Sequence, residues 1–149
     1  MGSSSAERGG RGQAGYSTRT LPAKLGLKSG DRVTILYAPE GYQATLGELP
    51  PQVKILTGRA SQLDFIQLFA RSRTDLEQDF AKAAARLKPD GMLWISWPKQ
   101  SSPLAGELNE NIVREVGLSV GLVDVKVAAI DDDWSGLKFV YRLKDRSSS

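Results

Sequence analysis

The pattern of apolar and polar residues is most regular in the middle of the chain. Residues 63–70 and 91–97 are two runs of apolar, β-branched and aromatic side chains, typical of strands that are buried on both faces. Between these runs, five apolar residues recur on one face of an amphipathic helix: Leu76, Phe80, Ala83, Ala84 and Leu87. A buried strand, a helix and a second buried strand predict a parallel β-α-β unit.

The ends of this helix are predicted by its flanking residues. Thr74 is a suitable N-cap, and Glu77 three residues later completes a capping box. Pro89-Asp90-Gly91 ends the pattern, because proline cannot continue a helix and glycine favours its C-terminal end. Asn109 and Gly121 mark the start and the end of a later helix in the same way.

Shorter patterns predict the other elements. Helical spacing occurs at 21–27, 43–48 and 109–120, and strand-like runs occur at 33–37, 53–56, 122–130 and 137–141. In the run 122–130, Val123, Val125 and Val127 alternate with charged residues, which is typical of a strand with one buried and one solvated face. Together with residues 137–141, this run predicts an antiparallel hairpin at the edge of the sheet.

Composition excludes several classes of site. The chain has no cysteine and no histidine, so it has no disulfide framework, no zinc or iron site with the usual ligands, and no Ser-His-Asp triad. Its apolar runs are too short to cross a bilayer, and its N-terminus lacks the apolar core of a signal peptide. We therefore expect a cytoplasmic protein with no membrane partner.

The net charge of +3 comes from the two ends of the chain. Residues 21–142 contain fifteen basic and fifteen acidic side chains, which leaves no broad positive surface for nucleic acid on the folded body. Residues 1–20 are rich in glycine, serine and arginine, and we expect them and residues 143–149 to be disordered tails. Arg8-Gly9-Gly10-Arg11-Gly12 is similar to an RGG segment, so RNA association through this tail is one alternative function.

The order of these elements resembles the second half of a Rossmann-like methyltransferase, on the evidence of Leu87-Lys88-Pro89-Asp90-Gly91 before a buried strand and of the closing antiparallel pair. The resemblance covers roughly residues 31–142. Together with the predicted elements, it implies one α/β domain over residues 21–142, a truncated Rossmann-like three-layer sandwich. Its sheet would be mostly parallel, with roughly six strands, helices on both sides and an antiparallel C-terminal hairpin at one edge.

The same resemblance implies a site for S-adenosylmethionine. The loop that would hold this methyl donor, Ala38-Pro39-Glu40-Gly41-Tyr42, lacks the glycine run that lets the backbone approach a ligand. The donor is therefore disfavoured as a cofactor. A methyltransferase-like enzyme with a degenerate donor loop stays open as a second alternative.

Three further motifs resemble a small bacterial family that is known only as a domain of unknown function. They are the segment LPAKLGLKSG at 21–30, Trp97-Pro98-Lys99 and Asp133-Trp134-Ser135-Gly136-Leu137. This resemblance spans nearly all of residues 21–142 and implies no activity.

Polar and aromatic residues follow the predicted strands, and α/β sheets bind ligands at the carboxyl ends of their strands. Glu40, Gly41 and Tyr42 follow the first strand and offer a carboxylate and an aromatic wall; the alternative is a plain turn with Tyr42 packed on its neighbours. Trp97 and Lys99 end a later strand, and Lys99 suits an anion; the alternative is a solvated lysine beside a core tryptophan.

The loop of the predicted hairpin is Asp131-Asp132-Asp133-Trp134-Ser135-Gly136. Its carboxylates offer hard oxygen ligands for Mg²⁺ or Ca²⁺, and Trp134 offers a stacking face. The 1-3-5 spacing of a calcium loop is absent, however. The alternative is a turn in which one aspartate accepts hydrogen bonds from backbone N–H groups and Trp134 covers the end of the sheet.

These residues form the predicted ligand-binding set: Glu40, Gly41, Tyr42, Trp97, Lys99, Asp131, Asp133, Trp134 and Ser135. The set has no nucleophile–base pair, and we predict no catalytic residue and no metal ligand within it. The leading hypothesis is a non-catalytic binding or regulatory protein. Its partner would be a small molecule or a protein bound in a cleft at the carboxyl edge of the sheet.

Overall fold

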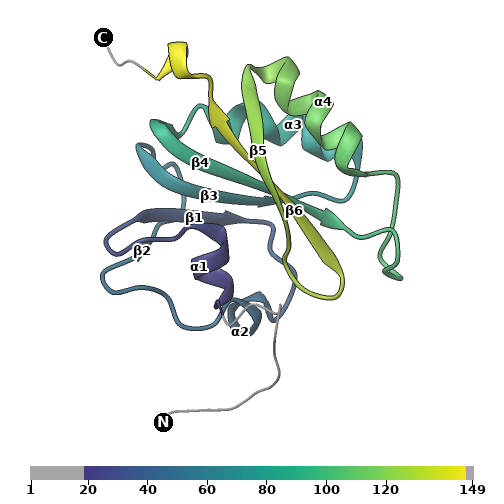
Figure 1. Cartoon of the computed structure of the whole chain (residues 1–149), viewed down its shortest axis with the longest axis horizontal. Helices are drawn as coiled ribbons and strands as arrows, with labels where there is room; N and C mark the ends of the chain where they lie inside the picture. The colour runs from purple at the N-terminus through teal and green to yellow at the C-terminus, as the bar shows by residue number, and fades with distance from the viewer. Residues whose placement is uncertain (1–18, 147–149) are drawn as a thin grey trace.

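The computed structural model describes residues 19–146, which form one six-stranded sheet with helices on both faces (Figure 1). The strands are β1 (Arg32–Leu36), β2 (Lys54–Ile55), β3 (Leu63–Phe69), β4 (Leu87–Pro98), β5 (Leu122–Ala129) and β6 (Trp134–Tyr141). The helices are α1 (Leu21–Leu25), α2 (Tyr42–Leu46), α3 (Arg73–Ala84) and α4 (Glu110–Val120). A single 3-10 turn, Leu143–Asp145, follows β6.

The strands lie in the order β2-β1-β3-β4-β6-β5. The first four are parallel to one another, and β6 pairs antiparallel with both β4 and β5. The predicted mostly parallel sheet of six strands with a C-terminal antiparallel hairpin is confirmed. From β1 the chain first crosses to β2 on one side and then to β3 on the other, so the topological switch point lies between β1 and β3.

Two apolar cores hold the layers together. The larger core joins one face of the sheet to α3 and α4, with Phe80 and Phe139 at its centre, and their rings meet edge to face at 5.1 Å. The smaller core joins the other face to α1 and α2 around Trp94. The indole Nε1 of Trp94 donates a 2.8 Å hydrogen bond to the carbonyl of Leu25, which docks α1 against the sheet. Figure 1 shows α3 and α4 together on one side and α1 and α2 on the other.

The ends of α3 differ from the prediction. Ser72, not Thr74, is the N-cap: its backbone is extended, and its hydroxyl accepts a 3.1 Å hydrogen bond from the N–H of Asp75. The helix also ends earlier, at Ala84. Residues 87–91 belong to β4, because Leu87 pairs with Leu63 before the sheet register shifts. A Cβ at Gly91 would lie 2.9 Å from the carbonyl oxygen of Leu63, so this glycine allows a close approach of two strands.

The predicted ends of α4 are confirmed, whereas α1 and α2 each end two residues before their predicted ends at 27 and 48. Asn109 caps α4, because its side-chain oxygen accepts a 2.9 Å hydrogen bond from the N–H of Ile112. Gly121 ends α4 in the left-handed conformation, with a φ of 106°.

The predicted valine face of β5 is wrong in the middle of the strand. A bulge between Asp124 and Lys126 adds one residue and interrupts the alternation. Val125 and Val127 are consequently 53% and 51% exposed. As the edge strand, β5 has a neighbour on one side only, so fewer groups are available to cover these side chains.

Residues 1–18 and 147–149 lie outside the described residues. The predictions that these residues are disordered and that Arg8–Gly12 is an RGG-like segment therefore stay predictions. At the inner ends of the two expected tails the structure has ordered residues: Thr20 caps α1, and Leu143–Asp145 form the 3-10 turn. Among residues 19–146, no helix is both long and apolar enough to cross a membrane.

Candidate functional site

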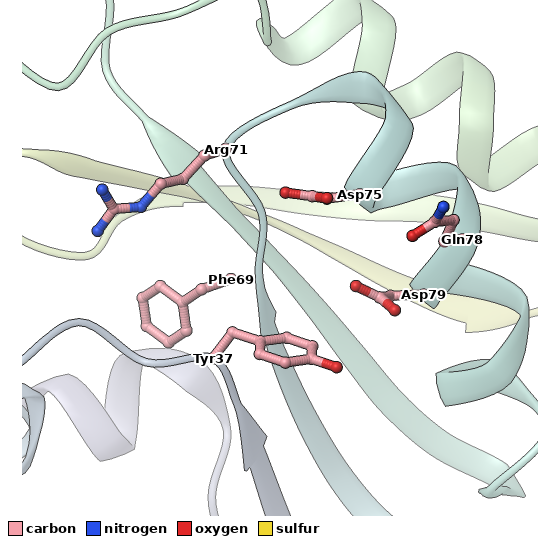
Figure 2. A pocket seen from close by; sticks show the side chains of 6 residues that line it. All are labelled: Tyr37, Phe69, Arg71, Asp75, Gln78 and Asp79. Atoms are coloured by element: carbon pink, nitrogen blue, oxygen red, sulfur yellow. The ribbon is translucent and has the colours of Figure 1, made fainter.

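A cleft with a volume of about 300 Å³ opens at the carboxyl edge of the sheet (Figure 2). Its wall is formed by six residues: Tyr37, Phe69, Arg71, Asp75, Gln78 and Asp79. Tyr37 directly follows β1, and Phe69 is the last residue of β3. The cleft therefore lies at the topological switch point, where open α/β sheets bind their ligands.

Helix α3 provides the acidic wall of this cleft. Asp75, Gln78 and Asp79 are separated by three and four residues, so they share one face of the helix. In Figure 2 both carboxylates point from α3 toward the side of the cleft that Phe69 and Tyr37 form. Asp75 lies in the first turn, where the helix dipole favours a negative charge.

Tyr37 has an unusual backbone conformation. Its φ is 60°, in the left-handed region that bulky residues rarely occupy, and its side chain is 69% exposed. Such a conformation costs of the order of 1–3 kcal/mol and occurs most often at functional sites. In Figure 2 the ring lies between Phe69 and the face of α3 that bears Asp79. The strained backbone thus presents an aromatic ring to the cleft instead of burying it.

A row of aromatic side chains supports the floor of the cleft. The ring of Phe69 meets Tyr42 edge to face at 4.8 Å and Trp134 edge to face at 5.0 Å. The guanidinium of Arg71 lies 5.4 Å from the ring centre of Trp134, in a cation–π contact. This contact turns the guanidinium of Arg71 away from the carboxylates on α3, as Figure 2 shows.

A buried chain of polar groups lies below this aromatic row. The hydroxyl of Tyr42 donates to Oε1 of Gln67 at 2.6 Å, and Nε2 of Gln67 donates to Oγ of Ser96 at 3.0 Å. Burial raises the pKa of Tyr42 well above its usual range, against the opposing effect of the hydrogen bond to Gln67. The phenol is therefore neutral at physiological pH and links α2 to β3 and β4.

The structure separates the residues of the predicted ligand-binding set. Tyr42 and Trp134 are buried in the aromatic row, and Trp97 is buried in the core on the opposite face of the sheet. Glu40 and Gly41 are exposed in the loop before α2. Gly41 and Tyr42 also line a second pocket, a mostly apolar one of about 330 Å³ between β1, β2 and α2.

The aspartates of the hairpin loop have structural roles. Oδ1 of Asp131 accepts hydrogen bonds from the N–H groups of Asp133 and Trp134, at 2.8 and 2.9 Å. Asp133 accepts from the hydroxyl of Ser102 through Oδ1 at 2.9 Å, and from the N–H of Lys99 through its carbonyl at 2.8 Å. The alternative of a backbone-capping turn is confirmed. Within residues 19–146, no group of three or more acidic side chains could hold a metal ion.

Ser135, the last residue of the predicted set, is half-buried in β6 and pairs across the sheet with Trp97 on β4 and Ala129 on β5. The predicted set contains none of the six residues that line the cleft: Tyr37, Phe69, Arg71, Asp75, Gln78 and Asp79. The acidic residues had a visible signal, because they recur on the polar face of a helix directly after a buried strand. Nothing in the sequence indicates the positive φ of Tyr37.

Solved structures of several S-adenosylmethionine-dependent methyltransferases have the same fold. A TehB-like enzyme from Corynebacterium glutamicum matches with a TM-score of 0.52 and 14% identity, over 86% of this chain and 90% of the enzyme. An S-adenosylmethionine-dependent methyltransferase from Aquifex aeolicus matches with a TM-score of 0.53 and 16% identity, over 78% of this chain and 85% of the enzyme. Fibrillarin from Aeropyrum pernix, with bound S-adenosylmethionine, matches with a TM-score of 0.53 and 14% identity, over 80% of this chain and 73% of fibrillarin. The fold is therefore a methyltransferase-like α/β fold.

The family is more specific than the fold. Residues 56–143 match the family described as protein of unknown function (DUF3052), and the chain belongs to this family. No protein of curated function matches the sequence.

Proposed function

We propose that this protein is a non-catalytic small-molecule-binding protein whose ligand occupies the cleft between β1, β3 and α3. The observation that carries the proposal is the position of Tyr37. A strained, largely exposed tyrosine at the switch point of an α/β sheet has no role in the core, whereas it supplies an aromatic surface to a ligand.

The lining of the cleft favours a small organic cation. The exposed ring of Tyr37 offers its negative face, and Asp75 and Asp79 add two carboxylates on the opposite wall. Arg71 is engaged with Trp134, so its charge is directed away from the carboxylates. A volume of about 300 Å³ lies at the lower end of the usual range for ligand pockets and suits a ligand of modest size.

Two features support a binding role over a catalytic one. The cleft lining contains no thiol, no amine and no serine or threonine hydroxyl, and its one hydroxyl, that of Tyr37, makes no hydrogen bond to a base among the described residues. The hydroxyl of Tyr42 is buried and donates its hydrogen bond to Gln67, and burial raises its pKa. It is therefore not available as a nucleophile for a ligand in the cleft.

A methyltransferase-like enzyme with a degenerate donor loop is the second candidate, and the similarity of fold to S-adenosylmethionine-dependent enzymes favours it. The β1–α2 loop argues against it. This loop has a single glycine, Gly41, whose left-handed backbone starts α2. Binding of S-adenosylmethionine is the minimum requirement of this candidate.

The test is a thermal-shift measurement on the full chain with choline, arginine, S-adenosylmethionine, its neutral product S-adenosylhomocysteine, and mononucleotides. A ligand at about 100 times its dissociation constant adds roughly 2.7 kcal/mol to the free energy of unfolding, which is several degrees for a domain of this size. We expect a shift with at least one organic cation and none with the nucleotides. Equal shifts with the two adenosyl compounds would favour the methyltransferase-like candidate.

Matched variants locate the binding. Tyr37→Ala and Asp79→Asn are expected to abolish the shift. Asp90→Asn is the control, because it removes an exposed carboxylate at the start of β4, before the buried part of that strand. This variant is expected to show the same thermal shift as the wild type. A shift that survives both cleft variants, or a panel in which no cation binds, would contradict the proposal.

A further inference from the structure

The two acidic side chains that line the cleft are not neutralised, unlike those on the neighbouring side of α3. Glu77 on the same helix pairs with Arg73 at 2.9 Å, and Glu115 on α4 lies 3.6 Å from the same guanidinium. Among residues 19–146, by contrast, no side chain pairs with the carboxylate of Asp75 or of Asp79. Like charges one helical turn apart repel each other, so this pair destabilises α3 slightly.

Two cationic side chains lie near this acidic pair, and neither neutralises it. Arg71 lies against Trp134 in its cation–π contact and is turned away from α3 (Figure 2). Lys82, three residues beyond Asp79 on α3, is exposed and forms no ion pair with any residue that the structure describes. The acidic wall therefore remains available to a positive charge from outside the fold.

The spacing of the two carboxylates suits two positive charges on one molecule. Side chains four residues apart on a helix have their Cβ atoms about 5–6 Å apart. Two ammonium groups joined by about four carbon atoms span a similar distance, because each bond is about 1.5 Å long and the chain zigzags. Asp79 is half-buried, whereas Asp75 is exposed and lies one turn nearer the start of α3. One ammonium group can therefore contact each carboxylate.

The opposite wall of the cleft suits the carbon chain between two such charges. The ring of Tyr37 is 69% exposed, and Phe69 lies beside it at the end of β3 (Figure 2). Aromatic rings contact methylene groups through their apolar surface and attract ammonium groups through their negative faces. The aromatic wall comes from β1 and β3 and the acidic wall from α3, so two independent features face each other across one cavity.

We propose that the cleft binds an α,ω-diamine, a flexible carbon chain with an ammonium group at each end. One ammonium group pairs with Asp79, the other pairs with Asp75, and the carbon chain lies along Tyr37. This inference rests on the proposed function and narrows its ligand from an organic cation to a dication. A ligand with a single charge on Asp79 leaves Asp75 unpaired and gains nothing from it.

The test is isothermal titration calorimetry of the full chain with 1,4-diaminobutane and with butan-1-amine, the monoamine of equal chain length, at pH 7 and low salt. The diamine is expected to bind about fivefold more tightly, which is the gain of one further ion pair at a partly exposed site. Asp75→Asn is expected to lower the affinity for the diamine to that for the monoamine, and to leave the affinity for the monoamine nearly unchanged.

Two control variants accompany this test. Asp75→Glu keeps the charge and is expected to keep most of the preference for the diamine. Asp90→Asn removes an exposed carboxylate outside the cleft and is expected to keep the wild-type affinities. Circular dichroism checks that every variant is folded, and because Asp75 is exposed we expect each of them to fold.

The outcomes separate this inference from the proposed function. Equal affinities for the diamine and the monoamine in a wild type that binds both would overturn the inference and leave the proposed function standing. An unchanged preference for the diamine in Asp75→Asn would also overturn the inference. A wild type that binds neither these amines nor choline would overturn both.

Discussion

The hydroxyl of Tyr42 and the side-chain amide of Gln67 are joined by a 2.6 Å hydrogen bond inside the core. Tyr42 is the first residue of α2, and Gln67 lies in the middle of β3. The bond therefore fixes the far end of the loop that begins at Tyr37. Because Tyr37 and β3 form two sides of the cleft, Tyr42 is a positioning residue for the proposed ligand site.

Replacement of Tyr42 by phenylalanine is expected to lower the free energy of unfolding by about 1–3 kcal/mol, because it leaves a buried acceptor of Gln67 without its donor. Urea denaturation measures this change. Tyr37→Phe is the control, since its exposed hydroxyl should contribute less than about 0.5 kcal/mol. Equal stabilities of the two variants would show that the Tyr42 hydroxyl does not hold α2.

Stability is expected to fall as the pH rises above about 10, the usual pKa of tyrosine. The pKa of Tyr42 is raised in the folded protein, so above the unfolded value the folded state binds more protons than the unfolded state. This stabilising contribution is complete below pH 10 and is lost as the pH increases. Urea titrations between pH 8 and 11 should show a steeper loss for the wild type than for Tyr42→Phe. Parallel curves would contradict the raised pKa.

Relief of the strain at Tyr37 is expected to separate stability from ligand binding. Asparagine tolerates a positive φ, so Tyr37→Asn should keep or raise the free energy of unfolding, by up to about 1 kcal/mol, and should abolish the ligand-induced thermal shift. Gln62, with a φ of 54° outside the cleft, offers a matched control. Gln62→Asn should have a similar effect on stability and leave the ligand shift unchanged. A Tyr37→Asn protein that still binds would remove Tyr37 from the site.

Asp64 is expected to stabilise the fold at neutral pH and to lose this effect in acid. Burial opposes its ionisation, but hydrogen bonds from Nζ of Lys88 at 2.8 Å and from the N–H of Arg32 at 2.9 Å hold its pKa below the usual range. The contribution is present above pH 4 and disappears as the pH falls through the lowered folded-state pKa. Asp64→Asn should therefore be less stable than the wild type at pH 7, with a difference that shrinks below pH 4. The exposed Asp132→Asn should show no such pattern.

The sheet could be predicted because its signals are local. Long apolar runs identify β3 and β4, and alternating residues followed by a turn identify the hairpin of β5 and β6. The early end of α3 could not be predicted, because it depends on the pairing of Leu87 with Leu63, a contact between distant parts of the chain.

The cleft could not be assembled from the sequence, because its walls depend on backbone torsion and on the relative placement of three elements. Nothing in the sequence marks the positive φ of Tyr37. One signal was visible and was not used: Gln67 is the one polar residue in the run 65–70, and a fully buried amide needs hydrogen-bond partners. That requirement links β3 to a polar group on another element, which the structure identifies as Tyr42.

The most direct test of the proposed ligand site is a ¹H–¹⁵N correlation spectrum of the full chain, titrated with choline and with S-adenosylmethionine. We predict that the amide shifts concentrate at Tyr37–Ala38, Phe69–Arg71 and Asp75–Asp79, the segments that form the cleft. Shifts confined to the apolar pocket between β1 and α2, or no shifts with either compound, would contradict the account.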